Sequence, residues 1–439
     1  MSETNGKKRI LSGFQDFLPE KMMARKRIIG KIKSAYELFG FLPQETPVLE
    51  YADLLLGKYG DNDKLVYQFR DKGDRHVAMR YDLTVPLSRV VQMYANDISF
   101  PYRRYQVGMV WRADKPGKGR YREFMQIDAD IVSDSSMLAD IETIFLDLQI
   151  MKSLSIDATV RMNDRRILDS LADICQIPAN TNSSLFRIID KYDKIGMSGV
   201  MDELRKVPFS KEILTIVKQY LSISGTNDEV LESLRKLLGN SSSFQVGYDC
   251  LSAINNALKD ADTSLASYRI DPTIARGLDY YTGLIFETTF NPDPEYGSIC
   301  SGGRYDRLIK GFDGNSLPTV GVSIGLDRLF AAMESINLIS QIKTTTQVFI
   351  VNFGNQYLGE YLRLAADLRG NGISVEISPD ASKLKKQLRC ADVKGIPNVI
   401  LMGSDELEQG KVVVRSMIDG SQAVIERKDI ASHRFGIAS

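Results

Sequence analysis

The sequence is poor in the residues that build most metal and triad sites. Among 439 residues there are two histidines, His76 and His433, and four cysteines. Zinc centres and catalytic triads that use histidine are therefore nearly excluded, and we expect no metal site of the protein's own. The cysteines, at positions 175, 250, 300 and 390, lie too far apart for a disulfide framework or a zinc motif. We expect a cytoplasmic protein whose chemistry depends on arginines, carboxylates and backbone groups.

Long apolar runs and net charge are also missing. No stretch approaches the roughly 20 apolar residues that span a bilayer, so no membrane partner is expected. Residues 1–10 are polar and basic, unlike a secretory signal. Lysine plus arginine and aspartate plus glutamate each total 56, which gives a net charge of zero. This argues against bulk electrostatic binding of nucleic acid but leaves room for a local basic face.

The chain is too long for one ordinary core, and its composition predicts where it divides. Residues 161–270 are rich in leucine, serine and lysine with helical periodicity, which predicts an inserted helical domain. Beyond a boundary near residues 341–346, strand and helix patterns alternate as in a compact α/β domain. We therefore predict a first domain in two parts, 1–160 and 271–340, with the insertion between them and an α/β domain at 346–439.

Local patterns predict the elements of the first domain. Apolar residues on one face predict a helix over 21–39, which ends at Gly40. A second helix is expected to be capped by Thr84. Strands are predicted over 76–82, 104–111 and 122–132, and further helices over 136–152 and 321–336, the last with Gly321 and Gly325 spaced for close packing.

The predicted strand 122–132 has two chemically different faces, because side chains alternate along a strand. A polar strand face is most often solvated. Here, however, Arg112 and Arg120 flank a Gly-Lys-Gly tip just before the strand, and guanidinium groups match phosphate oxygens in planar geometry. We interpret residues 112–122 as a hairpin that holds a triphosphate. The apolar set is Met125, Ile127, Ala129 and Ile131, and the other set is Arg122, Phe124, Gln126, Asp128 and Asp130.

Two further segments contain residues that a buried strand would not need. They read Arg276-Gly277-Leu278-Asp279-Tyr280-Tyr281 and Ser301-Gly302-Gly303-Arg304-Tyr305-Asp306. Both resemble the histidine-specific signatures of histidyl-tRNA synthetases. The three motifs of class II aminoacyl-tRNA synthetases also have counterparts, in the helix 21–39 with the strand near Pro47, in residues 112–130 and in residues 321–329.

The resemblance covers nearly the whole chain and implies both fold and activity. The implied fold is an α+β catalytic domain with a central antiparallel sheet, a helical insertion and a C-terminal α/β anticodon-binding domain. The implied activity is that of a histidine-tRNA ligase, which activates L-histidine with ATP to histidyl-adenylate and transfers it to tRNA(His). ATP with Mg²⁺ is then a substrate and no prosthetic group is expected. The resemblance also implies a homodimer.

The resemblance assigns roles residue by residue. Imidazole offers one donor and one acceptor, which a carboxylate and a tyrosine hydroxyl can satisfy. For the histidine site it implies Asp82 and Thr84 at the ammonium, Gln126 at the backbone groups, and Asp130 and Tyr281, with Tyr280 beside it, at the imidazole. For ATP it implies Arg112 and Arg276 as catalytic residues at the α-phosphate, Arg120 and Arg328 at the outer phosphates, Asp114 at the adenine amino group and Phe124 stacked on the ring.

Other interpretations stay open at this point. Asp82 and Thr84 could cap a helix, Arg328 could be a solvated helix residue, and one of the two tyrosines could be a core aromatic. The basic face of residues 381–391 is typical of a solvated amphipathic helix. Rival functions are a regulatory relative that senses histidine without catalysis, and a class II synthetase for another amino acid. The chain also departs from many bacterial members, with aspartate in place of glutamate at Asp82 and Asp130 and with Ala113-Asp114-Lys115-Pro116 after Arg112.

Overall fold

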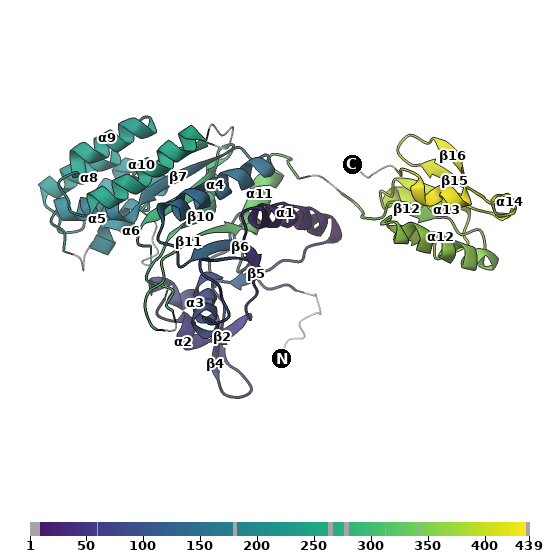
Figure 1. Cartoon of the computed structure of the whole chain (residues 1–439), viewed down its shortest axis with the longest axis horizontal. Coiled ribbons are helices and arrows are strands. Elements are labelled where there is room, and N and C mark those ends of the chain that lie inside the picture. Colours follow the sequence, from purple (N-terminus) through teal and green to yellow (C-terminus); the bar gives the residue numbers. More distant parts are fainter. Residues whose placement is uncertain are drawn as a thin grey trace, which may run out of the picture. The chain divides into compact units, whose positions relative to one another are not determined.

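The structure, a computed structural model, describes residues 9–58, 60–178, 182–261, 267–275, 281–311, 313–339 and 342–435. The chain divides into two compact units (Figure 1). The first comprises residues 1–15 and 28–338, and the second comprises residues 16–27 and 339–439. None of the described helices is long and apolar enough to cross a membrane.

The first unit is built on a sheet in which eight strands are described. The strands follow the order β1-β5-β6-β11-β10-β9-β7-β8. Neighbours are antiparallel except at the two edges, where β1 pairs with β5 and β7 pairs with β8 in parallel. The predicted central antiparallel sheet is therefore confirmed. The bounds are β1 Leu42–Pro43, β5 Tyr102–Trp111, β6 Glu123–Val132, β7 Ala158–Asp164, β8 Ser267–Ile270, β9 Leu284–Phe290, β10 Ser298–Arg304 and β11 Thr319–Gly325.

Two helices cover one face of this sheet, α4 (Met137–Ser153) and the part of α1 (Pro19–Leu38) from Ile28 onward. The hydroxyl of Tyr36 on α1 donates to the carbonyl of Ile127 at 3.1 Å, and the hydroxyl of Thr288 on β9 donates to Asp147 on α4. By strand register, Ile127 and Thr288 share one face, so the side chains of Gln126, Asp128 and Asp130 lie on the opposite one. Helix α11 (Leu326–Ser335) follows β11 directly.

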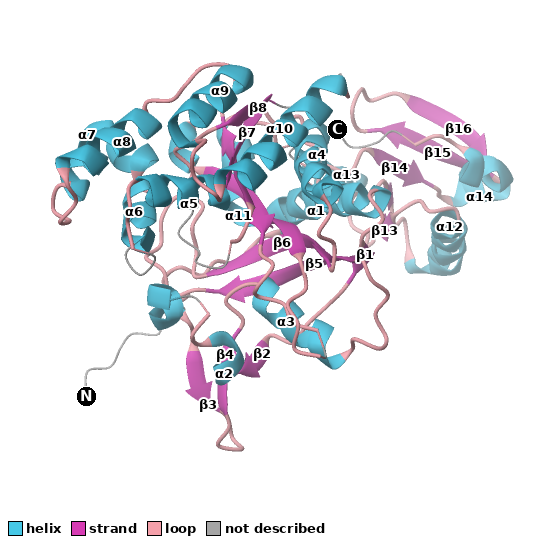
Figure 2. Cartoon of the chain, turned by 60° about the vertical axis from the view of Figure 1, so that its left-hand side comes forward, coloured by secondary structure: helices cyan, strands magenta, loops and turns pink. Residues whose placement is uncertain are grey.

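A smaller sheet supplies a segment that crosses the open face. It has the order β2-β4-β3 and packs with α2 and α3 around a core that contains Ala78 and Val85. From the chain between β4 and α3, the Leu83 carbonyl accepts from Arg104 on β5 at 3.1 Å. The bounds are β2 Leu49–Tyr51, α2 Ala52–Leu55, η1 Gly60–Leu65, β3 Gln68–Arg70, β4 His76–Met79 and α3 Thr84–Met93 (Figure 2).

Six helices are described between β7 and β8, and Figure 1 shows them gathered at the β7 end of the sheet. Apolar residues on the inward faces drive their packing, and α9 begins with a capping box formed by Thr226 and Glu229. The two ends of the region 161–270 belong to the strands β7 and β8. The bounds are α5 Arg165–Ile174, α6 Asn182–Ile189, α7 Tyr192–Leu204, α8 Lys211–Leu221, α9 Asn227–Leu238 and α10 Phe244–Asp260, and a 3₁₀ turn, η2 Pro294–Tyr296, lies between β9 and β10.

The C-terminal part of the second unit alternates strands and helices as the sequence predicts. Its sheet has the order β13-β12-β14-β15-β16, parallel around β12 and antiparallel from β14 onward. The core contains Val348, Leu364 and Ile400. The bounds are β12 Val348–Ile350, η3 Asn355–Tyr357, α12 Leu358–Gly370, β13 Val375–Ile377, α13 Leu384–Val393, β14 Asn398–Leu401, α14 Ser404–Glu408, β15 Lys411–Ser416, β16 Gln422–Glu426 and η4 Arg427–Ser432.

Two local predictions are wrong. The helix expected over 321–336 begins at Leu326, because residues 319–325 form β11, in which Val320, Val322 and Ile324 are buried at period two. Thr84 does not cap α3. It is the first helical residue, and Asp82 accepts hydrogen bonds from the backbone N–H of Thr84 and Val85 at 3.2 and 2.9 Å. The carboxylate two residues earlier takes the role expected of the hydroxyl.

Candidate active site

A row of polar side chains lies on the open face of β6. Gln126, Asp128 and Asp130 are 6, 2 and 3% exposed, so the solvated face that this alternation most often indicates is not what forms here. Burying a carboxylate costs several kcal/mol unless it is paired or hydrogen-bonded, and even a paired one contributes little to stability. A fold that buries two on one strand has placed them for a purpose other than stability.

Asp130 is held from two sides. Its carboxylate lies 2.5 Å from the Arg104 guanidinium on β5, and the Tyr305 hydroxyl donates to it. Burial raises the pKa of Asp130, while Arg104 and the Tyr305 hydrogen bond oppose that rise. Sequence reasoning missed both partners. Tyr305 lies within the segment Gly302-Gly303-Arg304-Tyr305-Asp306, whose unusual composition could have pointed to it. Nothing in the sequence marked Arg104.

Glycines make room for two of the predicted imidazole-binding side chains. A Cβ on Gly321, which pairs with Asp130 across β11 and β6, would lie 2.0 Å from the Asp130 Oδ1 atom. A Cβ on Gly303 would lie 2.8 Å from a ring carbon of Tyr281. The ring of Tyr281 packs against a buried cluster that includes Tyr305. Asp130, Tyr281 and Tyr305 are therefore brought into one neighbourhood.

Arg112 stands at the head of the hairpin between β5 and β6. Its Nε donates to the Tyr81 carbonyl at 3.0 Å, and its Nη2 lies 3.4 Å from the Gln126 amide oxygen. The guanidinium carbon lies 4.3 Å from the centre of the Tyr81 ring and 5.1 Å from that of Phe124. These partners are neutral, so they fix the orientation of the guanidinium without cancelling its charge. Arg112 is thus prepared to bind an anion beside Gln126 and Phe124.

The tip of the hairpin meets α11. Gly117 and Arg120 exchange two backbone hydrogen bonds of 3.0 Å, and a Cβ on Gly119 would lie 3.2 Å from the Cα of Arg328. Arg120 is exposed, whereas Arg328 is half-buried and donates to the Ser298 carbonyl at 2.8 Å. Arg328 is therefore not a simple solvated helix residue. The structure brings the hairpin that carries Arg120 against the helix that carries Arg328.

The remaining predicted residues lie in or near these elements. Asp114 is half-buried in the hairpin, and its carbonyl accepts from Arg122 at 3.0 Å. Asp82 is buried on the segment that crosses the open face and caps α3, as one alternative proposed. Arg276 and Tyr280 lie outside the described residues.

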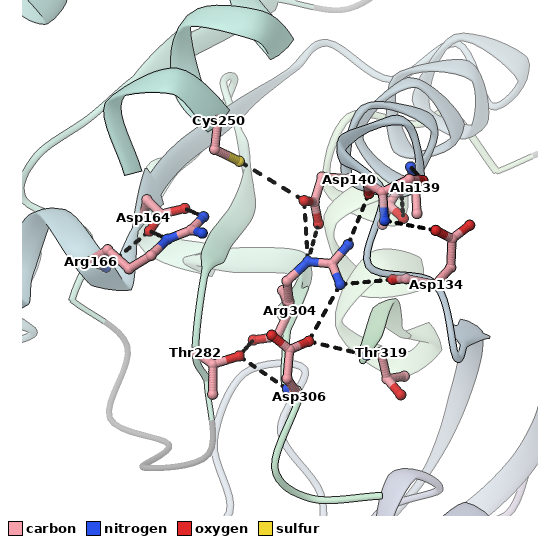
Figure 3. A network of polar contacts seen from close by, with 12 residues as sticks. Asp134, Ala139, Asp140, Asp164, Arg166, Cys250, Thr282, Arg304, Asp306 and Thr319 are labelled. Carbon is pink, nitrogen blue, oxygen red and sulfur yellow. Dashed lines mark hydrogen bonds and ion pairs between the residues drawn. The ribbon is translucent and has the colours of Figure 1, made fainter. Parts of the chain in front are cut away.

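Arg304 anchors the segment that carries Tyr305, a role that no sequence pattern indicated. Its guanidinium donates to Asp140 at 2.9 Å and to the carbonyls of Asp134 and Ser136 at 2.9 and 3.2 Å, all near the start of α4 (Figure 3). Its own carbonyl accepts from the Thr282 N–H at 2.8 Å, next to Tyr281. Arg304 thus ties α4, β10 and the Tyr281 segment together.

The chain is similar to known proteins over most of its length. The family model for histidyl-tRNA synthetase matches residues 13–329, and that for an anticodon binding domain matches residues 347–433. The histidine--tRNA ligase of Rhodopirellula baltica is 38% identical over 96% of this chain and 95% of its own, and that of Cytophaga hutchinsonii is 39% identical over 93% and 95%.

A solved structure shows the same fold. The histidyl-tRNA synthetase of Nostoc sp. PCC 7120 is 31% identical, covers 98% of this chain and 99% of its own, and superposes with a TM-score of 0.88. The predicted class II catalytic fold and C-terminal α/β domain are confirmed by this likeness and by the family models. The chain belongs to the histidyl-tRNA synthetase family.

Proposed function

We propose that this protein is a histidine-tRNA ligase that activates L-histidine with ATP and then transfers it to tRNA(His). The observation that carries the proposal is the buried row on β6 with Arg112 at its head. An acidic row suits a substrate with an ammonium and an imidazole, and the guanidinium beside it suits the phosphate that the histidine carboxylate attacks. The carboxylate attacks the α-phosphate, pyrophosphate leaves, and a terminal ribose hydroxyl of the tRNA takes the histidyl group.

The histidine side of the site is assigned to the β6 row and its neighbours. Asp130, paired with Arg104, accepts from an imidazole N–H. Tyr281 lies beside Tyr305 and completes the imidazole contacts, with Tyr280 next to it in the chain. Gln126 contacts the backbone groups of the substrate, and Asp82 and Thr84 bind its ammonium.

The ATP side is assigned to the hairpin and α11. Arg112 and Arg276 hold the α-phosphate, because charge developing there is best stabilised by donors that are already oriented. Arg120 and Arg328 hold the outer phosphates, with which Mg²⁺ enters as part of the substrate. Phe124 stacks on the adenine ring and Asp114 accepts from its amino group.

The assembly and the RNA contacts extend the proposal. We assign tRNA binding to both units, with the anticodon held by residues 346–439 and the acceptor arm near the helical residues 161–270. The protein acts as a homodimer in the cytoplasm. The retained C-terminal domain and the intact arginine set at Arg112, Arg120 and Arg328 argue against a regulatory relative without catalysis.

The proposal is tested by charging transcripts of tRNA(His) and of an unrelated tRNA with each of several labelled amino acids. We expect histidine to be attached to tRNA(His) alone. A purified, folded protein that binds histidine without charging this tRNA would instead support the regulatory relative.

The basic face of α13 offers a prediction about the RNA. Lys385 and Arg389 are exposed, and if they contact phosphates, the double change Lys385→Glu/Arg389→Glu should lower the kcat/KM for tRNA charging by about tenfold or more. Histidine-dependent pyrophosphate exchange should not change. A matched control is Arg363→Glu/Lys428→Glu, which reverses one arginine and one lysine, both exposed, in the same unit. If the two double variants lower the rate of tRNA charging equally, the basic face of α13 is a solvated surface without a specific contact to RNA.

The contacts of Arg304 predict that one substitution changes the KM for histidine without changing the KM for ATP. Arg304→Lys keeps the charge but cannot reproduce the contacts to Asp140, Asp134 and Ser136, so Tyr305 should lose its position against Asp130. We expect the KM for histidine to rise about tenfold while the KM for ATP stays within about twofold. Arg103→Lys is the control. Arg103 also forms an ion pair with α4, through Glu142, but it lies on β5 opposite Ile131, one position away from the Arg104–Asp130 pair. A rise in both KM values would indicate general loosening of the fold.

A further inference from the structure

Asp128 occupies the middle of the β6 row and has no role in the assignments above. It lies between Gln126 and Asp130 on the same face, and it is 2% exposed. Strand register places Gln106 of β5 and Ser323 of β11 beside it. Its carboxyl group therefore belongs to the face that the proposed function assigns to histidine.

Asp128 differs from Asp130 in having no ion pair among the described residues. The Oδ2 atom of Asp130 also lacks a hydrogen-bond partner there, but it lies 2.5 Å from the Arg104 guanidinium. The Ser323 hydroxyl, which accepts from the Gln126 amide at 2.7 Å, hydrogen-bonds the Asp128 carboxyl group. The Oδ1 atom of Asp128 is buried and has no hydrogen-bond partner among the described residues. A buried carboxyl oxygen without a partner is costly, and such exceptions in a folded protein call for a ligand or another function.

The charged groups around Asp128 set its protonation. Burial and then Asp130 raise the pKa of Asp128 to about 7, Arg104 from β5 and the Ser323 hydrogen bond lower it, and Asp82 from the crossing segment raises it. From behind the sheet, Tyr36 of α1 also interacts with Asp128. Asp128 thus exists in both protonated and ionised forms near neutral pH.

We propose that Asp128 is a further histidine-binding residue, whose Oδ1 atom hydrogen-bonds the substrate imidazole and shares one proton with the ring. The inference rests on the proposed histidine site. Asp130 accepts from one ring nitrogen, so the other nitrogen needs a donor. A protonated Asp128 is that donor, and moving the proton to the ring gives a carboxylate facing an imidazolium with the same total charge. Tyr281 is the alternative donor, and a hydrogen bond from its hydroxyl would leave the ring neutral and need no additional proton.

The two donors predict different proton balances. At about pH 8 free Asp128 is mostly ionised and free histidine has a neutral imidazole, so a complex that holds one shared proton must take it from the solvent. We expect close to one proton to be taken up per histidine bound, measured by titration calorimetry in two buffers of different ionisation enthalpy. Between about pH 7.5 and 8.5, the affinity for histidine should fall about tenfold.

Asp128→Asn provides the matching variant. An amide can donate to the imidazole at any pH, so proton uptake should fall to near zero and the affinity should become independent of pH over the same range. Asp147→Asn is the control, because Asp147 is a buried carboxylate, with a pKa raised to about 6 by burial, that binds Thr288 on the other face of the sheet. This variant should keep the proton uptake of the wild type.

The wild-type titration decides the matter even if Asp128→Asn fails to fold. Histidine binding without proton uptake at about pH 8 overturns the inference alone and points to Tyr281. Uptake that persists in Asp128→Asn overturns it as well. A wild-type protein that binds no histidine overturns the proposed function, and this inference with it.

Discussion

Arg112→Ala should slow formation of the adenylate by about two to three orders of magnitude. The reason is the loss of an oriented guanidinium beside the phosphate on which charge develops, a loss that costs roughly 3–4 kcal/mol in comparable sites. Arg112 is fixed by the Tyr81 carbonyl and the Gln126 amide and has neutral partners, so the orientation exists before ATP binds. Single-turnover measurement at saturating ATP and histidine reports this step directly.

The control for this variant lies in the same hairpin. The Arg122 guanidinium donates hydrogen bonds to the carbonyls of Asp114 and Ser12, at 3.0 and 3.3 Å. Arg122→Ala should therefore alter the hairpin without removing charge from the phosphate site. We expect a much smaller effect on single-turnover adenylation. If Arg112→Ala reacts within about threefold of the wild type, or if the two variants are equally slow, Arg112 does not have the assigned role.

Gly321→Ala should raise the KM for histidine by about two orders of magnitude, although it adds one methyl group. That group would lie 2.0 Å from the Asp130 Oδ1 atom and 2.9 Å from the Ala129 carbonyl oxygen, so Asp130 must move. A displacement of about 1 Å in a binding constellation can cost about a hundredfold. Measurement of histidine-dependent pyrophosphate exchange across histidine concentrations would show it.

Gly325→Ala is a matched control on the same strand. A Cβ at Gly325 would meet nothing within 4 Å, and the residue has a φ of −82°, which any amino acid adopts. Its kinetics should stay close to those of the wild type, and thermal melts would show whether either variant is unstable. A Gly321→Ala protein with an unchanged KM would mean that Asp130 does not need its observed position to bind substrate.

The strands of the central site could be predicted because their chemistry alternates. In 122–132, apolar and polar side chains follow each other at period two, and β6 forms over nearly that range. Residues 321–325 are different, because their two glycines are also spaced as small residues are on a packed helix. They form a strand because they pair with Asp130 and its neighbours on β6. A local pattern cannot report a partner strand so distant in the sequence.

The sequence marked several side chains that the structure brings together, but not the contacts that hold them there. Gln126 and Asp130 stand in a motif and could be proposed as site residues, whereas Arg104, Tyr305 and Arg304 act through partners far away in the chain. Tyr305 and Asp130, for example, are 175 residues apart. The alternation of apolar and polar residues along β6 predicts one solvated face, but both faces are buried. The polar face is covered by the segment between β4 and α3, which a local pattern cannot reveal.

If this fold activates histidine, the exchange of pyrophosphate with ATP must depend on that amino acid alone, and this exchange can be measured without tRNA. Each amino acid is offered in turn to the full-length protein with ATP, Mg²⁺ and labelled pyrophosphate, without tRNA. Label should enter ATP with histidine and stay at background with every other amino acid. Exchange supported by a different amino acid, or no exchange with histidine from a folded protein, would contradict it.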